Sequence, residues 1–235
     1  MSSTPEKLTA ELLSRTRDVP VGDIEQLLRT ATAAIVEMGV ADTVSILERV
    51  GDHGFTTRAP TDDLAIAADR LQRELHEGPC VEASYDNDLL ASGDVGADSR
   101  WPYWGPAAVA EGVQAVISVQ LYNHEQTMGA LNLFHTDKRE FTTDDLELAR
   151  TLAVPISIEL AHCRQDEHLW KAIDARHRIG QAQGILMERF KISDAVSFSV
   201  LRRLSQQGNR KLHLVADDIV RTGQLPPEVE HLIAG

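Results

Sequence analysis

The chain has 235 residues, of which 43% are hydrophobic and 25% charged, so it has the composition of an ordinary globular protein and the length of two domains. Its net charge of -13 comes from residues 1–163, which carry 12 basic and 27 acidic side chains, whereas residues 164–235 carry 11 and 9. The two cysteines are far apart in the sequence, which argues against a disulfide framework and a metal site. No apolar run approaches the ~20 residues of a membrane span, and no apolar segment near the N-terminus suits a secretory signal. These features predict a cytoplasmic protein.

The first part of the sequence changes from a helical to an alternating pattern. Residues 4–17 and 23–38 are predicted to be helices, and Asp23 can cap the second of them. From residue 42 the period changes to alternation, so residues 42–50 and 55–60 are predicted to be strands. The glycine-bounded stretch between these strands predicts a turn.

A second cycle of helix, strands and helix follows. The next helix is predicted over residues 61–78, with Thr61 as its N-cap and Gly78 at its end. The later patterns predict a short strand over residues 87–94 and a loop leading into a short helix over 99–112. Two strands follow over 113–122 and 128–135, joined by a hairpin-sized link, and then a capped helix over 142–154. This order is typical of an α+β domain in which helices flank an antiparallel sheet.

Three polar residues interrupt the strands on faces that this fold is expected to cover. Ser118 and Gln120 lie opposite the apolar face of one strand, and Asn132 lies within the apolar set of the next. Together with Trp101 in the preceding loop, they are the candidates for contacting a small-molecule ligand. The alternatives are local hydrogen bonds or solvent exposure for the polar residues, and a satellite apolar cluster for Trp101.

These segments resemble a known sensor family. LQRELHEGPC, SRWPYWGPAAVAEGVQAVISVQL and MGALNLF occur in the order found in a GAF domain of the actinobacterial type, over roughly residues 23–162. The resemblance implies a pocket on one side of the sheet for a small molecule, and terminal helices that often pair two subunits. The NKxxxFxxxDE signature of cyclic-nucleotide-binding members and the chromophore-attachment context of phytochromes are missing, so the ligand stays open.

A helix is expected to lead out of this domain over residues 156–177. Pro155 should kink it or open a new helix, because proline has no backbone N–H to donate. An approximate 3-4 spacing of apolar residues allows a coiled-coil seam, made of Ile156, Leu160, Cys163, Trp170 and Ile173. The alternative is a single helix that packs on its own domain.

The remaining sequence predicts an all-α three-helix bundle over residues 171–223. The chain would thus consist of an N-terminal helical extension (1–22), the sensor domain, this bundle and a C-terminal tail (224–235). Ser193 is the expected N-cap of the middle helix, and glycines end the last two helices. Ala182 and Gly184 are small residues on the first helix, where glycine costs roughly 1 kcal/mol relative to alanine. Close packing of the following helices is the expected reason for both.

The segments IGQAQGILMERFKIS and LRRLSQQGNRKLHLVADDIV resemble an ANTAR domain, the RNA-binding module of bacterial transcription antiterminators. Two positions depart from that pattern. The family usually has lysine where Gln183 stands, and its Ala-Phe pair reads Ser197-Phe198 here. The first departure removes one positive charge from the signature, and the second keeps the aromatic ring.

Hairpin RNA offers phosphates and unstacked base edges, which arginine, lysine, glutamine and asparagine contact well. The candidate RNA-binding residues are Arg178, Gln181, Gln183, Arg202, Arg203, Gln206, Asn209, Arg210 and Lys211. The resemblances therefore imply a regulator without catalytic residues, in which the GAF domain senses a signal or dimerises. The ANTAR domain, acting as a homodimer, would bind hairpin loops of a nascent leader transcript and prevent a terminator from forming.

Two alternatives remain at this stage. Some GAF domains reduce free methionine sulfoxide with cysteine thiols, and Cys80 is either such a thiol or a buried structural cysteine. That chemistry needs a second thiol nearby and would not explain the basic C-terminal region. The other alternative is a protein-binding module, or a helix-turn-helix that binds DNA.

Overall fold

The computed structural model describes residues 5–20, 23–51, 54–83, 88–123, 127–224 and 229. Parts of the predicted turn at 51–54 and of the link at 123–127, and most of the C-terminal tail, lie outside these residues. The chain divides into two compact units, residues 1–163 and 164–235.

The first unit is built around an antiparallel sheet. Its elements are α1 (Pro5–Thr16), α2 (Ile24–Glu37), β1 (Thr43–Val50), β2 (Gly54–Arg58), α3 (Asp63–Leu75), α4 (Pro79–Ala83), β3 (Leu89–Ser92), α5 (Trp104–Glu111), β4 (Ala115–Tyr122), β5 (Thr127–His135) and the beginning of α6 (Thr143–Phe190). The strand order is β2-β1-β5-β4-β3, and every pair is antiparallel. The predicted α+β class is confirmed.

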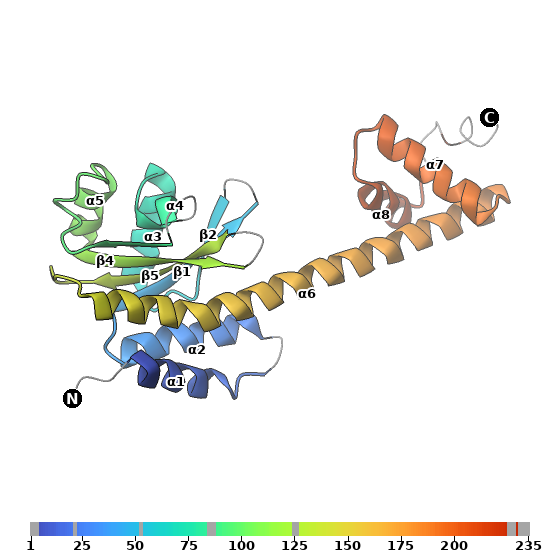
Figure 1. Ribbon diagram of the computed structural model, residues 1–235. Coiled ribbons are helices and arrows are strands. Elements are labelled where there is room, and N and C mark those ends of the chain that lie inside the picture. Colours follow the sequence, from blue (N-terminus) through green and yellow to red (C-terminus); the bar gives the residue numbers. More distant parts are fainter. Residues whose placement is uncertain are drawn as a thin grey trace. The chain divides into compact units, whose positions relative to one another are not determined.

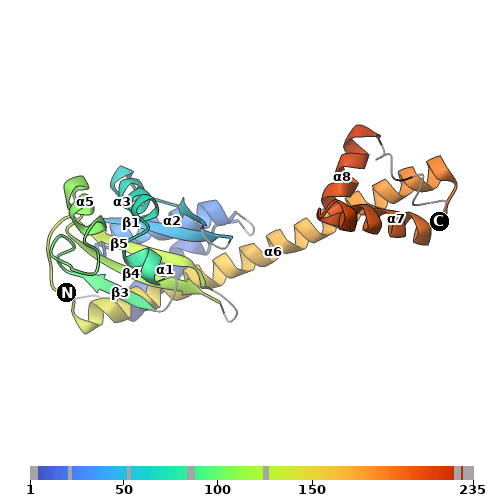
Figure 2. The ribbon, with the colours of Figure 1, turned by 90° about the horizontal axis from the view of Figure 1, so that it is seen from above.

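Helices cover both faces of the sheet, because the strands are apolar on both sides (Figure 1). On one face α1, α2 and α6 enclose a core to which the strands contribute Ile46, Leu131 and Val119. On the other face α3 and α5 enclose a second core that contains Trp104 and Phe134. Figure 2 looks down on the first unit from the side of the sheet that carries α3 and α5.

Capping residues set the helix starts. Asp23 caps α2 as predicted, accepting a hydrogen bond of 3.0 Å from the backbone of Gln26. The predicted cap of α3 is wrong by one position, since Asp62 rather than Thr61 accepts from the helix backbone. The helix also ends before Gly78, at a left-handed His76, because the chain turns there into α4, which the sequence patterns did not predict.

Helix α6 is continuous through Pro155 and contributes residues to both units. It opens with reciprocal hydrogen bonds between Thr142 and Asp145, which satisfy the amides of its first turn. A new helix does not begin at Pro155, so that part of the prediction is wrong. Ile156 and Leu160 are buried in the core of the first unit, which makes them unavailable to a seam with another chain.

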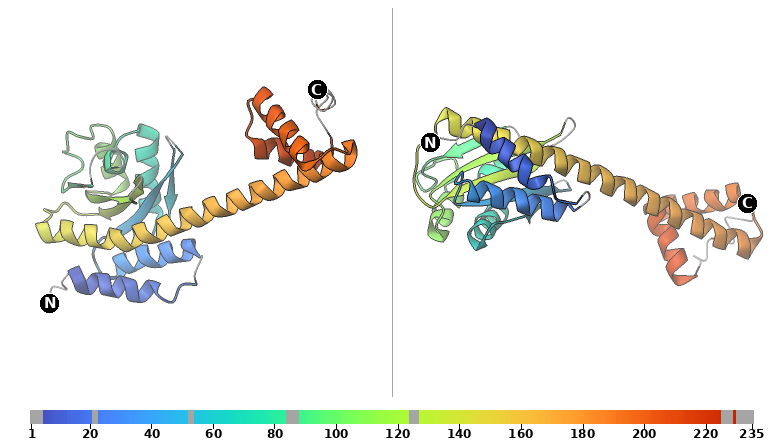
Figure 3. Two further views of the ribbon diagram at one scale, coloured as in Figure 1. Left: turned by 45° about the vertical axis from the view of Figure 1, so that its right-hand side comes forward. Right: turned by 90° about the horizontal axis from the view of Figure 1, so that it is seen from below.

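The second unit consists of the rest of α6 with α7 (Asp194–Gln207) and α8 (Leu212–Thr222), which pack beside its last turns (Figure 3). Ser193 caps α7 as predicted. Ala182 is fully buried in the bundle core, whereas a side chain added at Gly184 would meet no atom within 4 Å. The predicted packing role therefore holds for Ala182 and is wrong for Gly184. No helix within the described part of the chain is long and apolar enough to cross a membrane.

Candidate functional site

Helix α7 presents two arginines outward from the bundle. Val200, Leu201 and Leu204 point into the core, so helical periodicity turns Arg202 and Arg203 to the outside, where both are exposed. Among the described residues neither arginine has an acidic partner. Their positive charge is therefore available to a ligand.

Two of the other predicted cations, Arg178 and Arg210, differ, because aspartates of α8 neutralise them. Arg178 lies 3.4 Å from Asp217, and Arg210 lies 2.7 Å from Asp218, whose pKa is lowered by hydrogen bonds from Arg210 and Arg221. Surface pairs of this kind are weak and can exchange for another anion. Arg178 and Arg210 stay candidates for RNA contact, with less free charge than the arginines of α7.

Gln183 joins α6 to the start of α7. Its side-chain amide donates to the carboxylate of Asp194 at 2.6 Å and approaches the hydroxyl of Ser197 at 3.3 Å. Since the resemblance places lysine at this position, the same contact would be an ion pair in such relatives. Gln183 thus has an evident structural role beside its predicted role in RNA contact.

The remaining predicted residues lie on exposed surface. Gln181 projects from α6, and Gln206 lies on α7, one turn beyond Arg202 and Arg203. Asn209 has a left-handed backbone (φ 46°) in the turn before α8, and Lys211 precedes the first residue of α8. The structure places Arg202, Arg203 and Gln206 together on α7, with Asn209 and Lys211 in the link that follows.

The candidate ligand site of the first unit is a buried polar network under α3. Across three adjacent strands, Ser45, Asn132 and Ser118 are directly paired in register. The hydroxyl of Ser118 donates to the amide oxygen of Asn132 at 2.7 Å. The amide nitrogen of Asn132 donates to Asp69 of α3 at 3.0 Å, and Ser45 donates to the same carboxylate oxygen at 3.0 Å.

Two polar atoms beside this network have no hydrogen-bond partner in the described part of the chain: the second carboxylate oxygen of Asp69 and the side-chain nitrogen of Gln72. Both side chains are fully buried. Burial raises the pKa of Asp69 to about 6, although hydrogen bonds from Ser45, Thr57 and Asn132 act in the opposite direction. Buried polar atoms normally have partners, so the pair indicates a place for a water molecule or a ligand group.

Cys80 lies beside the same network and is fully buried. Its backbone amide donates to the side-chain oxygen of Gln72 at 2.8 Å. Burial, and next the charge of Asp69, raise the pKa of the Cys80 thiol well above its usual value. A thiol catalyst needs a lowered pKa, so these surroundings favour the structural role for Cys80.

The other two pocket candidates make local contacts, as their alternatives proposed. Gln120 donates to the backbone oxygen of Ala83 at 2.9 Å and to Thr127 at 2.8 Å. Trp101 is buried edge-on against Trp104, with ring centroids 5.5 Å apart, and its indole donates to Glu82 at 2.9 Å.

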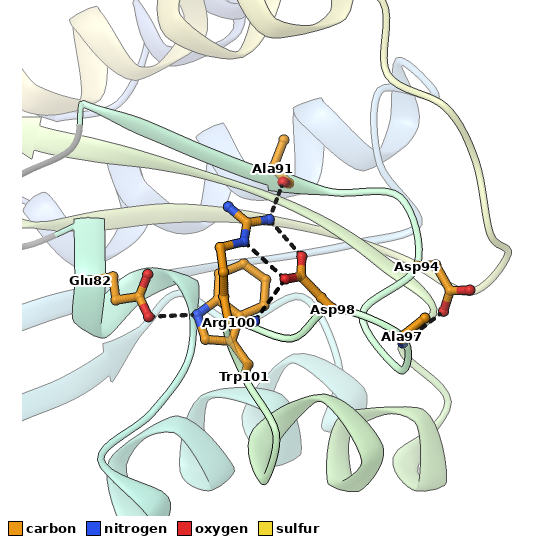
Figure 4. Close-up of polar contacts among 7 residues, drawn as sticks. All are labelled: Glu82, Ala91, Asp94, Ala97, Asp98, Arg100 and Trp101. Carbon is orange, nitrogen blue, oxygen red and sulfur yellow. Dashed lines mark hydrogen bonds and ion pairs between the residues drawn. The ribbon is translucent and has the colours of Figure 1, made fainter.

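Arg100 holds the outer side of Trp101 in place (Figure 4). Its guanidinium carbon lies 4.5 Å from the ring centroid of Trp101, and the group donates to the carboxylate of Asp98 and to the backbone oxygen of Ala91. The hydrogen bonds from Arg100 lower the pKa of Asp98 to about 2. This arrangement fixes the position of Trp101 in the loop.

The sequence reasoning found Ser118 and Asn132 but missed Ser45, Asp69 and Gln72. A signal for two of them was present, because Ala65, Ala68, Asp69 and Gln72 occupy the helical spacing of a buried stripe. A carboxylate and an amide within such a stripe indicate a polar site.

Family models match both units. One described as GAF domain matches residues 22–161, and one described as ANTAR domain matches residues 167–220. No curated protein matches the chain.

Solved structures resemble roughly 70% of the chain. A GAF domain from a phosphoenolpyruvate-protein phosphotransferase of Coxiella burnetii has a TM-score of 0.58 at 16% identity, covering 70% of this chain and 97% of that one. The corresponding Acinetobacter GAF domain has a TM-score of 0.55 at 11% identity, covering 72% and 99%. Free methionine-R-sulfoxide reductase from Neisseria meningitidis has a TM-score of 0.55 at 16% identity, covering 71% and 96%. Likeness at these identities shows the fold alone.

Proposed function

Because the chain belongs to the GAF domain family and continues into an ANTAR domain, we propose that it is a transcription antitermination regulator that binds hairpin loops of a nascent leader transcript. Binding stabilises the hairpins against the competing terminator, so that transcription continues. The protein acts as a homodimer, whose two ANTAR domains hold paired hairpins.

The observation that carries the RNA-binding part is the charge of α7. Arg202 and Arg203 are exposed and have no acidic partner among the described residues, whereas Arg178 and Arg210 are paired with aspartates of α8. Arginine binds phosphates and base edges with its planar fork of donors. Gln206, one turn further along α7, adds a side chain that can read a base edge.

The buried network supports the sensing part. Among the described residues, one carboxylate oxygen of Asp69 and the side-chain nitrogen of Gln72, on one turn of α3, have no hydrogen-bond partner. A small molecule that carries a donor and an acceptor side by side would satisfy both atoms. Helix α6 contains residues of both units, so a displacement of its first turns on ligand binding is transmitted along the same backbone to the ANTAR domain.

The test uses the full chain to select RNA ligands from a pool of hairpins with randomised loops. The affinity of the chain for the selected RNA is then measured at several salt concentrations. Replacing Arg202 and Arg203 with alanine together should weaken binding at least tenfold and reduce the slope of log K against log salt by about 1 to 2, because two phosphate contacts are lost.

Arg221→Ala is the matched control, since Arg221 is exposed on α8 and paired with Asp218. Its substitution should leave both the affinity and the slope unchanged. Failure to select any hairpin, or equal loss in all variants, would contradict the proposal. Competition with duplex DNA over the same salt series separates RNA binding from the helix-turn-helix alternative.

A thiol-dependent reductase is the alternative activity for the first unit. A Cys80→Ser variant that retains any turnover of free methionine sulfoxide would exclude Cys80 as the catalyst. The buried, protonated state of the Cys80 thiol predicts that the unsubstituted chain shows no turnover through this residue.

A further inference from the structure

Phe198 is a large aromatic residue that the bundle leaves uncovered. It lies on α7, where 41% of its surface is exposed, although Val200 and Leu201 beside it are buried. Residues four apart share one side of a helix, so Phe198, Arg202 and Gln206 form a continuous strip along α7. We call these three residues the α7 strip.

The α7 strip has the chemistry of a single-stranded nucleic acid site. Arg202 is exposed without an acidic partner among the described residues, and Gln206 offers an amide at the far end. Unpaired bases in RNA loops stack on aromatic rings, while phosphates pair with arginine. An exposed ring one turn from an uncompensated arginine therefore suits a base and its adjoining phosphate.

The other large exposed apolar residues of α7 and α8 lack this combination. Leu214 on α8 is 45% exposed but is aliphatic, and the arginines near it are paired with Asp217 and Asp218. Val196 on α7 is 40% exposed and aliphatic, so it offers no ring for a base to stack on. Phe198 is the aromatic residue of α7, and it shares its side of the helix with Arg202.

We propose that the ring of Phe198 stacks on an unpaired base of the bound RNA loop while Arg202 holds the phosphate next to that base. This inference rests on the proposed RNA-binding function, to which it adds an aromatic contact from Phe198. It predicts that RNA affinity has a stacking component that depends weakly on salt, beside the ionic component from Arg202 and Arg203.

The experiment uses the full chain and the RNA hairpin selected from the randomised pool, with 2-aminopurine placed at each loop position in turn. Phe198→Ala should weaken binding roughly 5- to 100-fold, the range of one base–aromatic stack. The salt slope should not change. Phe198→Tyr should keep most of the affinity, whereas Phe198→Leu should lose it, because leucine retains the apolar surface but not the ring.

The fluorescence of one 2-aminopurine position should be quenched by the unsubstituted chain and not by Phe198→Ala, since quenching reports stacking. Val196→Ala and Leu214→Ala are the controls and should bind as the unsubstituted chain does. Full affinity of Phe198→Leu, or a change of oligomeric state in Phe198→Ala, would overturn the stacking role and assign the residue to a protein contact. If no hairpin is selected at all, the proposed function itself fails.

Discussion

Asn132 shows how one side chain organises the sensor site. It lies between two serines of neighbouring strands, accepts a hydrogen bond from Ser118 and donates to Asp69 on a helix 63 residues earlier. Strand alternation predicted that Ser118 and Asn132 interrupt a covered face, because side chains alternate between the faces of a strand. It could not identify Asp69 as their partner, since nothing local links a helix to a strand so distant in sequence.

Asp69 makes the stability of the first unit depend on pH. Its pKa is about 6 in the folded protein and 3.8 in an ordinary carboxyl group, so the folded state binds this proton more tightly than the unfolded chain does. The stability that comes from the protonated form is present below pH 4 and is lost as the pH rises through 6.

An Asp69→Asn variant isolates this contribution, because asparagine stays neutral. Between pH 5 and pH 8 the unsubstituted chain should lose about 1 kcal/mol of unfolding free energy relative to Asp69→Asn. Urea unfolding followed by the fluorescence of the buried Trp101 and Trp104 measures the difference. A difference that does not vary with pH would show that Asp69 is already ionised at pH 5.

Helix α6 shows what a continuous pattern does and does not reveal at the scale of an element. The apolar spacing predicted a helix. Pro155 argued for a kink or a new helix, and Gly184 argued for close packing against a neighbouring helix. The helix nevertheless continues through Pro155, and Gly184 faces open space. The first half packs on the sheet through Ile156 and Leu160, and the last turns pack in the bundle through Ala182 and Leu186.

Gly184→Ala should therefore stabilise the second unit by about 1 kcal/mol, because alanine is the better helix former and its Cβ meets no atom within 4 Å. Circular dichroism during thermal unfolding of the full chain measures the effect. Gly105→Ala is the contrasting variant, since a Cβ there would lie 2.1 Å from the backbone oxygen of Val95 and should destabilise the first unit. Destabilisation by Gly184→Ala would mean that another surface packs against this turn.

At the scale of the whole molecule, the two units have separate apolar cores. The cores of the first unit lie on the two faces of the sheet, and the core of the second lies among α6, α7 and α8. Among the described residues, none belongs both to the core of the bundle and to a core of the sheet. Each unit thus has its own source of hydrophobic stabilisation.

This separation predicts two unfolding transitions. Leu131→Ala in the sheet and Leu201→Ala in the bundle should each lower the stability of one unit by about 2 to 5 kcal/mol, the usual cost of truncating a buried leucine. Calorimetry of the full chain should show one transition shifting in each variant while the other stays in place. A shift of both transitions in either variant would indicate that the units unfold together.

The sequence by itself determined the elements other than α4, most of their caps, the α+β class of the first unit and the helical bundle of the second, because periodicity and capping are local properties of neighbouring residues. It also supplied a set of nine candidate RNA-binding residues. Only the tertiary structure decided that aspartates of α8 neutralise Arg178 and Arg210 while Arg202 and Arg203 remain without acidic partners among the described residues. Likewise, only the packing of α3 on the sheet brings Asp69 and Gln72 to Asn132, because hydrogen bonds and ion pairs depend on distances between elements, which the order of residues along the chain does not contain.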